Sequence, residues 1–168
     1  EYIFSSNLFG IDLLSGLDFL KKDADMNGTI ADKEVHSFFS ELRFKVFNST
    51  NIDVSLRREY DSQYDTFDTG RLQINNNFFE DIIYRASIGT GYRTPTPYEL
   101  YSSYGNTTLK PEKSISYDLG SEINFKKAST KLYLGAFETR VEDIITYASS
   151  KYRQSTANLK TYGSEIRL

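Results

Sequence analysis

The chain has 168 residues, a net charge of −3 and no cysteine, with thirteen Tyr and twelve Phe but no Trp. The absence of cysteine excludes disulfides, zinc–thiolate sites and thiol catalysis, and the lack of a basic balance gives no support to nucleic-acid binding. The mean hydropathy of −0.49 and the lack of any apolar run near about eighteen residues exclude a transmembrane helix, but not a membrane β-barrel, whose strands are only half apolar.

The first half of the chain alternates apolar and polar residues with the period of two that predicts β-strands. We expect strands over residues 8–21, 35–47, 52–61 and 70–78, separated by a polar loop at 22–34, a short turn at 48–51 and a polar loop at 62–68. A tight connection at 79–81 then leads into the next strand.

The second half continues the pattern around a loop of roughly twenty residues that holds all three prolines. Strands are predicted over 82–93, 114–125, 130–141 and 158–168, with a short turn at 126–129 and a loop or ragged strand extension at 142–156. The total is about eight strands of roughly ten to fourteen residues, longer than the ~5–6 typical of soluble sheets. Their connections alternate between short and long.

The polar positions of these strands carry charges of both signs in mid-run. They are Asp12, Asp18, Glu41, Arg43, Lys45, Asp53, Arg57, Arg85, Asp118, Glu122, Glu165 and Arg167. In a soluble antiparallel sheet this face would lie in solvent, whereas in a barrel it would line a wet lumen. Periodicity alone leaves both interpretations open.

Four blocks of sequence carry a family resemblance. They are ASIGTGYRTP from Ala86 to Pro95 with ELY at 99–101, LKPEKS at 109–114 after Asn106, YDLG at 117–120, and VEDII at 141–145 followed by YGSE at 162–165. Their order and spacing over about eighty residues resemble those of TonB-dependent outer-membrane receptors, with the cobalamin-transporter branch most similar and siderophore receptors next. Thr94 and Ser164 depart from the family's usual Ala and Val.

The resemblance implies an all-β fold, an antiparallel up-and-down transmembrane β-barrel of about 22 strands closed around a plug. This chain would supply about eight consecutive strands, and residues 1–168 would all belong to the barrel domain. It also implies contact with outer-membrane lipid of a Gram-negative bacterium, and active uptake of a large scarce ligand (cobalamin-like or a siderophore). TonB would act through a plug domain that is not in this chain.

The family-motif residues are interpreted as structural. They are Gly89, Gly91, Arg93, Pro95, Glu99, Leu100, Leu109, Pro111, Glu112, Gly120, Gly163 and Glu165. Gly89 and Gly91 fall on the lumen-facing positions, where a missing side chain leaves room for neighbours, and the prolines end or pin strands. Tyr98, Tyr101 and Tyr104 lie on the long loop, where they are candidates for ligand contact or for rim aromatics at the membrane interface.

A second motif competes with this interpretation. Asp23, Asp25, Asn27, Thr29 and Glu34 fall at ligand positions of a twelve-residue EF-hand loop, with Gly28 at its sixth position. The alternative function is therefore a soluble EF-hand-like module that binds Ca²⁺, with helices on either side of this loop. Gly10 and Gly16 interrupt the first of those helices, and the flanking residues also alternate as strands, so a calcium-binding loop between strands is a further alternative.

Other signals predict no chemistry. His36 is the only histidine, so a histidine metal or catalytic cluster cannot be built. No nucleophile–base arrangement is found, and we expect no enzymatic activity. The chain starts at Glu1 without Met and ends inside an alternating run, so we expect a piece of a longer protein whose first and last strands are unpaired edges.

Overall fold

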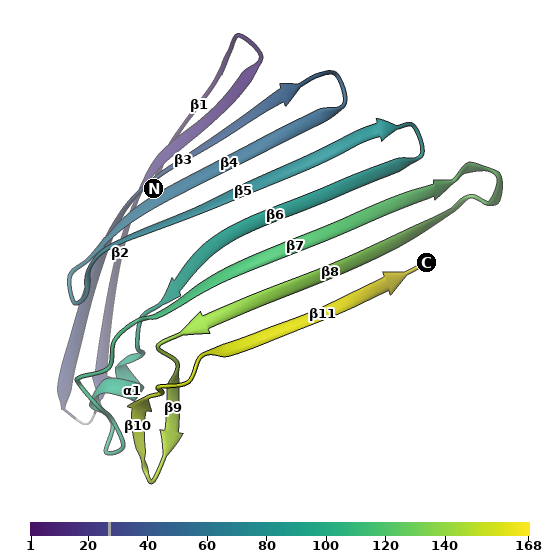
Figure 1. Cartoon of the computed structure of the whole chain (residues 1–168). Coiled ribbons are helices and arrows are strands. Elements are labelled where there is room, and N and C mark those ends of the chain that lie inside the picture. Colours follow the sequence, from purple (N-terminus) through teal and green to yellow (C-terminus); the bar gives the residue numbers. More distant parts are fainter. Residues whose placement is uncertain (27) are drawn as a thin grey trace.

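The computed structural model describes the backbone of residues 1–26 and 28–168, and it leaves the side chains at 26, 29, 31 and 78 undescribed. Within this range, nine antiparallel strands form one continuous sheet in the order β1-β2-β3-β4-β5-β6-β7-β8-β11 (Figure 1). The strands are β1 (Tyr2–Leu8), β2 (Ile11–Met26), β3 (Thr29–Val46), β4 (Thr50–Asp61), β5 (Asp65–Phe79), β6 (Ile82–Arg93), β7 (Glu112–Phe125), β8 (Thr130–Glu142) and β11 (Leu159–Arg167).

The two ends of the sheet differ in their connections. Short turns join β1 to β2, β3 to β4, β5 to β6 and β7 to β8 at one end, the last through a 3-10 turn at Lys126–Ala128. The other end carries helix α1 (Pro97–Tyr101) and a separate hairpin of β9 (Ile145–Ala148) and β10 (Lys151–Gln154), side by side below the wall in Figure 1. The predicted alternation of short and long connections holds only in the second half of the sheet, where long connections join β6 to β7 and β8 to β11. In the first half it is wrong, because β2–β3 and β4–β5 are joined by short connections at the same end. The first and last strands of the sheet, β1 and β11, are its edges.

The prediction of one strand over residues 8–21 is wrong, and the count of eight becomes nine. Phe9 and Gly10 form a tight turn with φ of 53° and 80°, which splits β1 from β2. The loop predicted at 22–34 is also wrong, because β2 and β3 continue as a paired hairpin from Lys21↔Glu34 to Met26↔Thr29. Backbone pairing between β2 and β3 makes this segment a strand hairpin, although its polar composition is typical of a loop.

Three further segments are more regular than predicted. The loop expected at 62–68 shrinks because β5 already starts at Asp65. The segment 142–156 holds the β9–β10 hairpin. The proline-bearing loop contains α1, whose start at Pro97 fits the preference of proline for the first helical turn.

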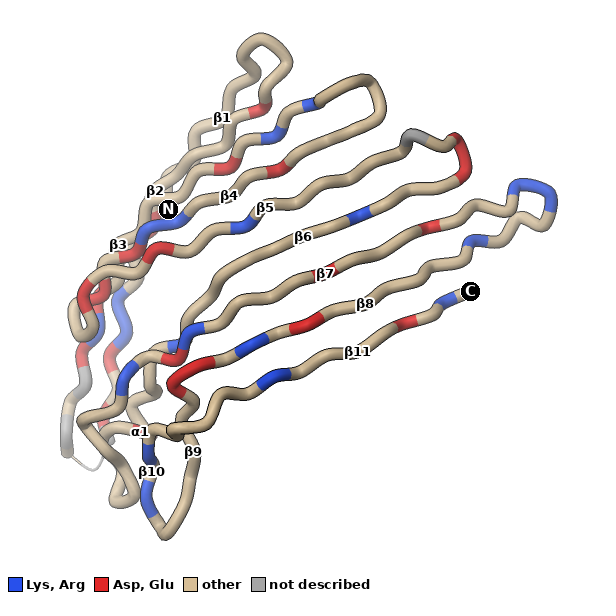
Figure 2. Tube along the Cα trace, in the orientation of Figure 1, with Lys and Arg blue, Asp and Glu red and all other residues tan. Residues whose placement is uncertain are grey.

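All twelve mid-strand charges fall on one face of the sheet, as the registers show. Ion pairs join them across strands: Arg57 Nη1 lies 3.0 Å from Asp18 Oδ2, Arg85 Nη2 lies 3.2 Å from Glu122 Oε2, and Arg43 contacts Asp53. Figure 2 shows charges of both signs spread along the strands. We call this the polar face.

The opposite face, called here the apolar face, carries Leu, Ile and Phe side chains that no other described element covers. Leu17, Phe38, Leu56, Leu72, Leu119 and Ile166 are exposed on it. Within the described residues the buried apolar side chains are only Val35, Pro95, Leu100 and Leu109. A soluble sheet buries its apolar face against a second layer, so this single layer does not fit the soluble alternative.

A charged belt limits the apolar face on the side of the long connections. It consists of Lys21, Glu34, Arg58, Asp68, Glu138, Arg140 and Lys160, which share the apolar face by register. They pair with one another, for example Arg58 Nε to Asp68 Oδ1 at 2.6 Å and Lys160 Nζ to Glu138 Oε2 at 2.9 Å.

No helix in the described part of the chain is long and apolar enough to cross a membrane.

Candidate functional site

The candidate site lies where two long connections leave the sheet. The helical loop, residues 94–111, joins β6 to β7, and the hairpin loop, residues 143–158, joins β8 to β11. At their base Arg93, the last residue of β6, pairs in register with Glu112, the first residue of β7. Its guanidinium donates from Nε and Nη2 to the two Glu112 oxygens at 2.8 and 2.9 Å, and from Nη1 to Glu99 Oε2 at 2.9 Å.

A local sequence signal starts α1. Thr96 caps the helix by accepting from Glu99 N at 3.2 Å, and the Glu99 carboxylate accepts from Thr96 N at 2.7 Å. This reciprocal pair is a capping box. Leu100 and Leu109, which belong to the helical loop, are both buried. The Glu-Leu and Leu-Lys-Pro parts of the motif therefore supply the small apolar core of this loop.

The hairpin loop is fixed to the helical loop by backbone hydrogen bonds. Tyr152 N donates to Tyr104 O at 2.9 Å, and Asn106 Nδ2 donates to Tyr152 O at 3.2 Å. Lys110 N donates to Gln154 Oε1 at 2.8 Å, and Ile145 N donates to Glu112 Oε1 at 2.8 Å. The first three of these hydrogen bonds join the two loops to each other, and the fourth joins the hairpin loop to β7.

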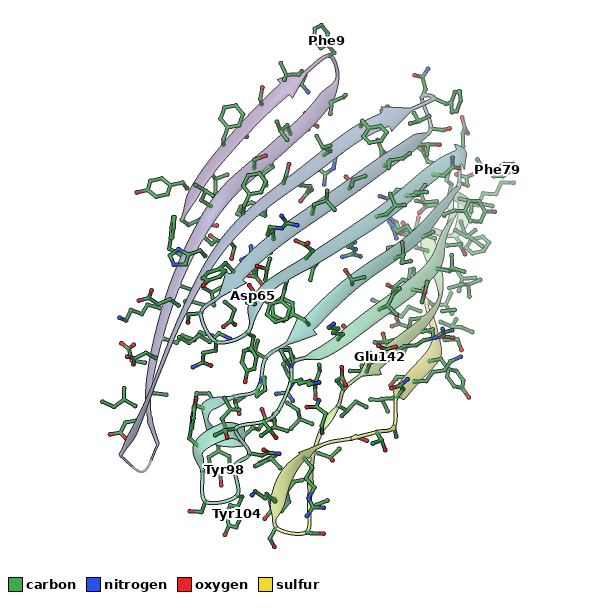
Figure 3. The ribbon with its side chains drawn as sticks, turned by 60° about the vertical axis from the view of Figure 1, so that its left-hand side comes forward. Phe9, Asp65, Phe79, Tyr98, Tyr104 and Glu142 are labelled. Atoms are coloured by element: carbon green, nitrogen blue, oxygen red, sulfur yellow. The ribbon has the colours of Figure 1, made fainter. Side chains whose placement is uncertain are left out.

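Tyrosines from both loops meet on their exposed side. Tyr98 and Tyr152 lie edge to face with ring centroids 6.1 Å apart, Tyr104 and Tyr147 do so at 5.9 Å, and Tyr147 and Tyr152 lie 5.2 Å apart. We call these four residues the tyrosine surface. Figure 3 shows Tyr98 and Tyr104 at the loop end of the molecule, beside the β9–β10 hairpin. Such rings offer flat apolar area together with hydroxyl groups that form hydrogen bonds.

The loop end of the molecule is locally basic. The hairpin loop contains Lys151 and Arg153 but no acidic residue after Asp143. Burial by itself would raise the pKa of Glu99, but hydrogen bonds from Arg93 and Thr96 outweigh it and hold that pKa below its ordinary value. Glu99 therefore stays ionised and paired, and the lysine and arginine of the hairpin leave the loops locally basic.

The third predicted loop tyrosine lies elsewhere. Tyr101 interacts electrostatically with Tyr64 of the β4–β5 turn, where burial is the main cause that raises the pKa of Tyr64 to about 12 and Tyr101, Asp61 and Glu99 add to it. Lys33 bridges this area, with its Nζ 2.6 Å from buried Asp61 Oδ2 and 2.6 Å from Thr94 Oγ1. Tyr101 is part of the support of the loop rather than of its exposed surface.

The structure places the other motif residues within the wall. Gly89 and Gly91 lie on the polar face as predicted, but a Cβ at Gly89 would meet Arg71 only at an ordinary 3.5 Å. Gly120 and Gly163 leave room for polar-face aromatic rings, since a Cβ would lie 3.1 Å from the Tyr133 hydroxyl and 2.9 Å from the Phe137 ring. Glu165 pairs with Arg167. β6 ends before Pro95, and β7 begins directly after Pro111.

The predicted calcium loop is the tip of the β2–β3 hairpin. Its helix–loop–helix alternative is wrong, because strands flank it on both sides. Asp23, Asp25 and Glu34 share one strand face, and Glu34 pairs with Lys21 at 3.4 Å. Asn27 lies outside the described residues, as does the side chain of Thr29. Among described side chains, no three acids or histidines gather to hold a metal ion, so calcium binding stays a prediction.

Sequence reasoning missed Tyr147 and Tyr152, which complete the tyrosine surface. A signal was present: Ser149 and Ser150, both with positive φ, separate two short runs that alternate around Tyr147 and Tyr152. Two such runs around a two-residue turn are typical of a hairpin.

Comparison with known proteins agrees with this geometry. The sequence profile of the family described as TonB dependent receptor-like, beta-barrel, matches residues 3–168. The vitamin B12 transporter BtuB of Vibrio vulnificus is 28% identical over 145 residues, which cover 82% of this chain and 23% of that protein. BtuB of Photobacterium profundum is 26% identical over 113 residues, covering 66% of this chain and 19% of the relative.

Solved structures share the fold. The siderophore receptor PirA from Pseudomonas aeruginosa superimposes with a TM-score of 0.85 at 20% identity, covering 96% of this chain and 34% of that one. A variant of the ferric enterobactin receptor PfeA from the same species gives 0.82 at 16% identity, covering 96% and 31%. The chain spans about a fifth of the length of the curated relatives it matches. With a family profile matched from residue 3 to residue 168 and the barrel-wall fold, this chain belongs to the TonB-dependent receptor β-barrel family.

Proposed function

We propose that the protein is an outer-membrane receptor and active transporter of a Gram-negative bacterium, of which this chain forms part of the barrel wall. The apolar face carries the proposal, because it is uncovered, continuous across the sheet and limited by the charged belt. That arrangement fits a lipid-facing band that ends at a headgroup layer. The polar face would then line the lumen around a plug.

Family membership and connection length together orient the wall. Barrels of this kind have short periplasmic turns and longer extracellular loops. The four short turns would therefore face the periplasm, and the tyrosine surface would face the outside. It lies where an external ligand first meets the wall.

The ligand class proposed is a large scarce molecule, cobalamin-like or a siderophore. The names of the relatives support both, since two are vitamin B12 transporters and one solved structure is a siderophore receptor. Energy would come through TonB acting on a plug outside this chain. We expect the protein to transport without catalysing a reaction.

Uptake by the full-length protein tests the function. Deletion of its gene should abolish accumulation of either vitamin B12 or a ferric siderophore, and a plasmid copy should restore it only in cells with an intact TonB. Uptake that persists in the deletion strain for both ligand classes, or that needs no TonB, would contradict the proposal.

The tyrosine surface is the proposed ligand contact. Tyr98→Ala combined with Tyr147→Ala should weaken binding of the transported ligand to the purified receptor by about 1–3 kcal/mol, since each aromatic contact is worth about 0.5–1.5 kcal/mol. Tyr60→Ala is the matched control, because Tyr60 and Tyr147 are both 53% exposed and Tyr60 lies on the apolar face of β4. If Tyr60→Ala weakened ligand binding as much as the double substitution at Tyr98 and Tyr147, the tyrosine surface would not be the ligand contact.

Calcium at the β2–β3 tip is a separate proposal supported by the oxygen-rich sequence of Asp23–Glu34. Isothermal calorimetry of the full-length receptor with Ca²⁺ tests it. Asp23→Ala with Glu34→Ala should remove the heat of binding, and an unchanged titration would exclude this loop as the site.

A further inference from the structure

Arg93 lies at a point where the wall meets both loops. Its backbone ends β6, and its guanidinium holds a carboxylate from the neighbouring strand and a carboxylate from α1. The Glu112 carboxylate in turn accepts from Ile145 N, the first residue of β9. One side chain therefore connects β6, β7 and α1 directly, and β9 through Glu112.

The geometry of these contacts is that of a strong ion pair. Both oxygens of Glu112 are engaged at 2.8 and 2.9 Å, and both oxygens of Glu99 lie within 3.2 Å of Arg93 nitrogens. The two carboxylates are only 14% exposed, while the arginine is 44% exposed. Two-pronged arginine–carboxylate bonds are stronger and more directional than single ones, and partial burial of the acids reduces screening by solvent.

The two loops are joined to each other without Arg93. Tyr152 and Asn106 link them by hydrogen bonds at 2.9 and 3.2 Å, Gln154 links to Lys110 at 2.8 Å, and the tyrosine rings pack across the seam. The contacts within the pair of loops and the contacts to the wall are thus separable by mutation.

We propose that Arg93 is a positioning residue that fixes the helical loop and the hairpin loop to the wall as a single body, so that the tyrosine surface is formed before any ligand binds. That the tyrosine surface binds a ligand rests on the proposed function, whereas the arrangement of the loops does not. A preformed surface avoids the conformational cost of ordering two loops during binding.

Distances between paired spin labels in the full-length receptor test this inference. This chain has no cysteine, so labels can be attached to introduced cysteines. All of the labelled positions are exposed. Labels at Thr107 and Ser149 measure the distance between the two loops, and labels at Thr107 and Lys127 measure the distance from the helical loop to the wall. Labels at Asn48 and Lys127 measure a distance within the wall. The unsubstituted receptor should give one narrow distance distribution for each pair without ligand.

Arg93→Gln should cause the loop-to-wall pair to lose its single narrow distribution, while the loop-to-loop and wall-to-wall pairs keep theirs. Arg85→Gln is the matched control, because Arg85 also joins two strands through an ion pair and is 43% exposed, with its partner Glu122 at 18%. It should leave all three distributions unchanged.

Arg93→Lys separates the effect of two-pronged hydrogen bonding from the effect of positive charge. A lysine keeps the charge but cannot form two-pronged bonds to two carboxylates, so it too should broaden the loop-to-wall distribution. The wall-to-wall pair shows whether Arg93→Gln assembles into a barrel. If that variant does not assemble, Arg93→Lys still tests the proposal. An unchanged loop-to-wall distribution in Arg93→Lys, or a loop-to-loop distribution that broadens equally, would overturn the proposal. None of these outcomes depends on transport.

Discussion

At the scale of single residues, Gly105 shows how tightly the helical loop turns. Its N–H donates to Ser102 O at 2.8 Å, directly after α1. A Cβ at this position would lie 2.4 Å from the carbonyl oxygen of Leu100 and 2.8 Å from Tyr101 N, both backbone atoms. Backbone cannot move aside as a flexible side chain can, so glycine is required here by close approach.

Gly105→Ala should therefore displace α1 and weaken the loop by about 1–3 kcal/mol, the usual cost of overpacking. Faster protease cleavage within residues 94–111 of the folded receptor would report it. Gly91→Ala is the control, because its Cβ would meet only the Ser114 hydroxyl at 3.1 Å, and its cleavage rate should stay close to that of the unsubstituted protein.

Acid should loosen the helical loop through Glu99. Its pKa is lowered from an ordinary value of 4.5, so the folded loop favours the ionised carboxylate. The stabilisation is complete above the ordinary pKa and is lost as pH falls through the lowered folded pKa. A spin label at Thr107 should keep its mobility from neutral pH down to about 4.5 and then become more mobile.

Glu99→Gln cannot ionise, so the label in that variant should already be more mobile at neutral pH and should respond less to acid. A label response in Glu99→Gln identical to that of the unsubstituted receptor would assign the acid effect to another group, such as Glu112.

At the scale of elements, the β1–β2 hairpin contains two glycines that are needed for different reasons. Gly10 has a φ of +80° and nothing within 4 Å of a built Cβ, so only backbone conformation requires it. Gly16 lies mid-strand, where a Cβ would meet the Phe39 ring at 2.4 Å and Tyr2 O at 2.7 Å. The first glycine turns the chain, and the second lets an aromatic ring of β3 cross β2.

Gly10→Ala should lower the free energy of unfolding by roughly 1–2 kcal/mol, the cost of a left-handed residue with a Cβ. Gly16→Ala should cost at least as much, about 1–3 kcal/mol from overpacking. Urea unfolding of the receptor in detergent, followed by far-UV circular dichroism, measures both. Restoring space with Phe39→Leu should recover stability in Gly16→Ala but not in Gly10→Ala.

At the scale of the whole molecule, the sheet has two faces that meet different surroundings. Leu72 lies on the apolar face of β5 between Val54 and Ile88, and the next residue, Gln73, lies on the polar face between Asp53 and Ser87. The same substitution at adjacent positions therefore samples the two environments in one strand.

Leu72→Arg should destabilise the barrel in lipid by about 2–4 kcal/mol, as expected for a charge near the bilayer midplane. Gln73→Arg should have a much smaller effect, because it joins a face already lined with paired charges. Unfolding in lipid vesicles measures the difference. Equal losses at both positions would contradict the assignment of Leu72 to lipid.

The sequence by itself determined the strand period, the two faces, the two long connections of the second half and the family. These features depend on neighbours along the chain: the period of two assigns each side chain to a face, and the motif blocks have fixed spacing. All twelve mid-strand charges lie on the predicted face for this reason. Pro95 likewise marked the end of β6 correctly, whereas β7 begins two residues before the predicted start at 114, directly after Pro111.

Only the tertiary structure decided which loop residues act together. Tyr147 and Tyr152 join Tyr98 and Tyr104 from more than forty positions away, as the Asn106–Tyr152 contact across 46 positions illustrates. Pairing with β3 likewise turned the polar segment 22–34 into strand and removed the helical alternative at Asp23–Glu34. Contacts between distant segments depend on the register and tilt of a whole sheet, which local composition does not encode.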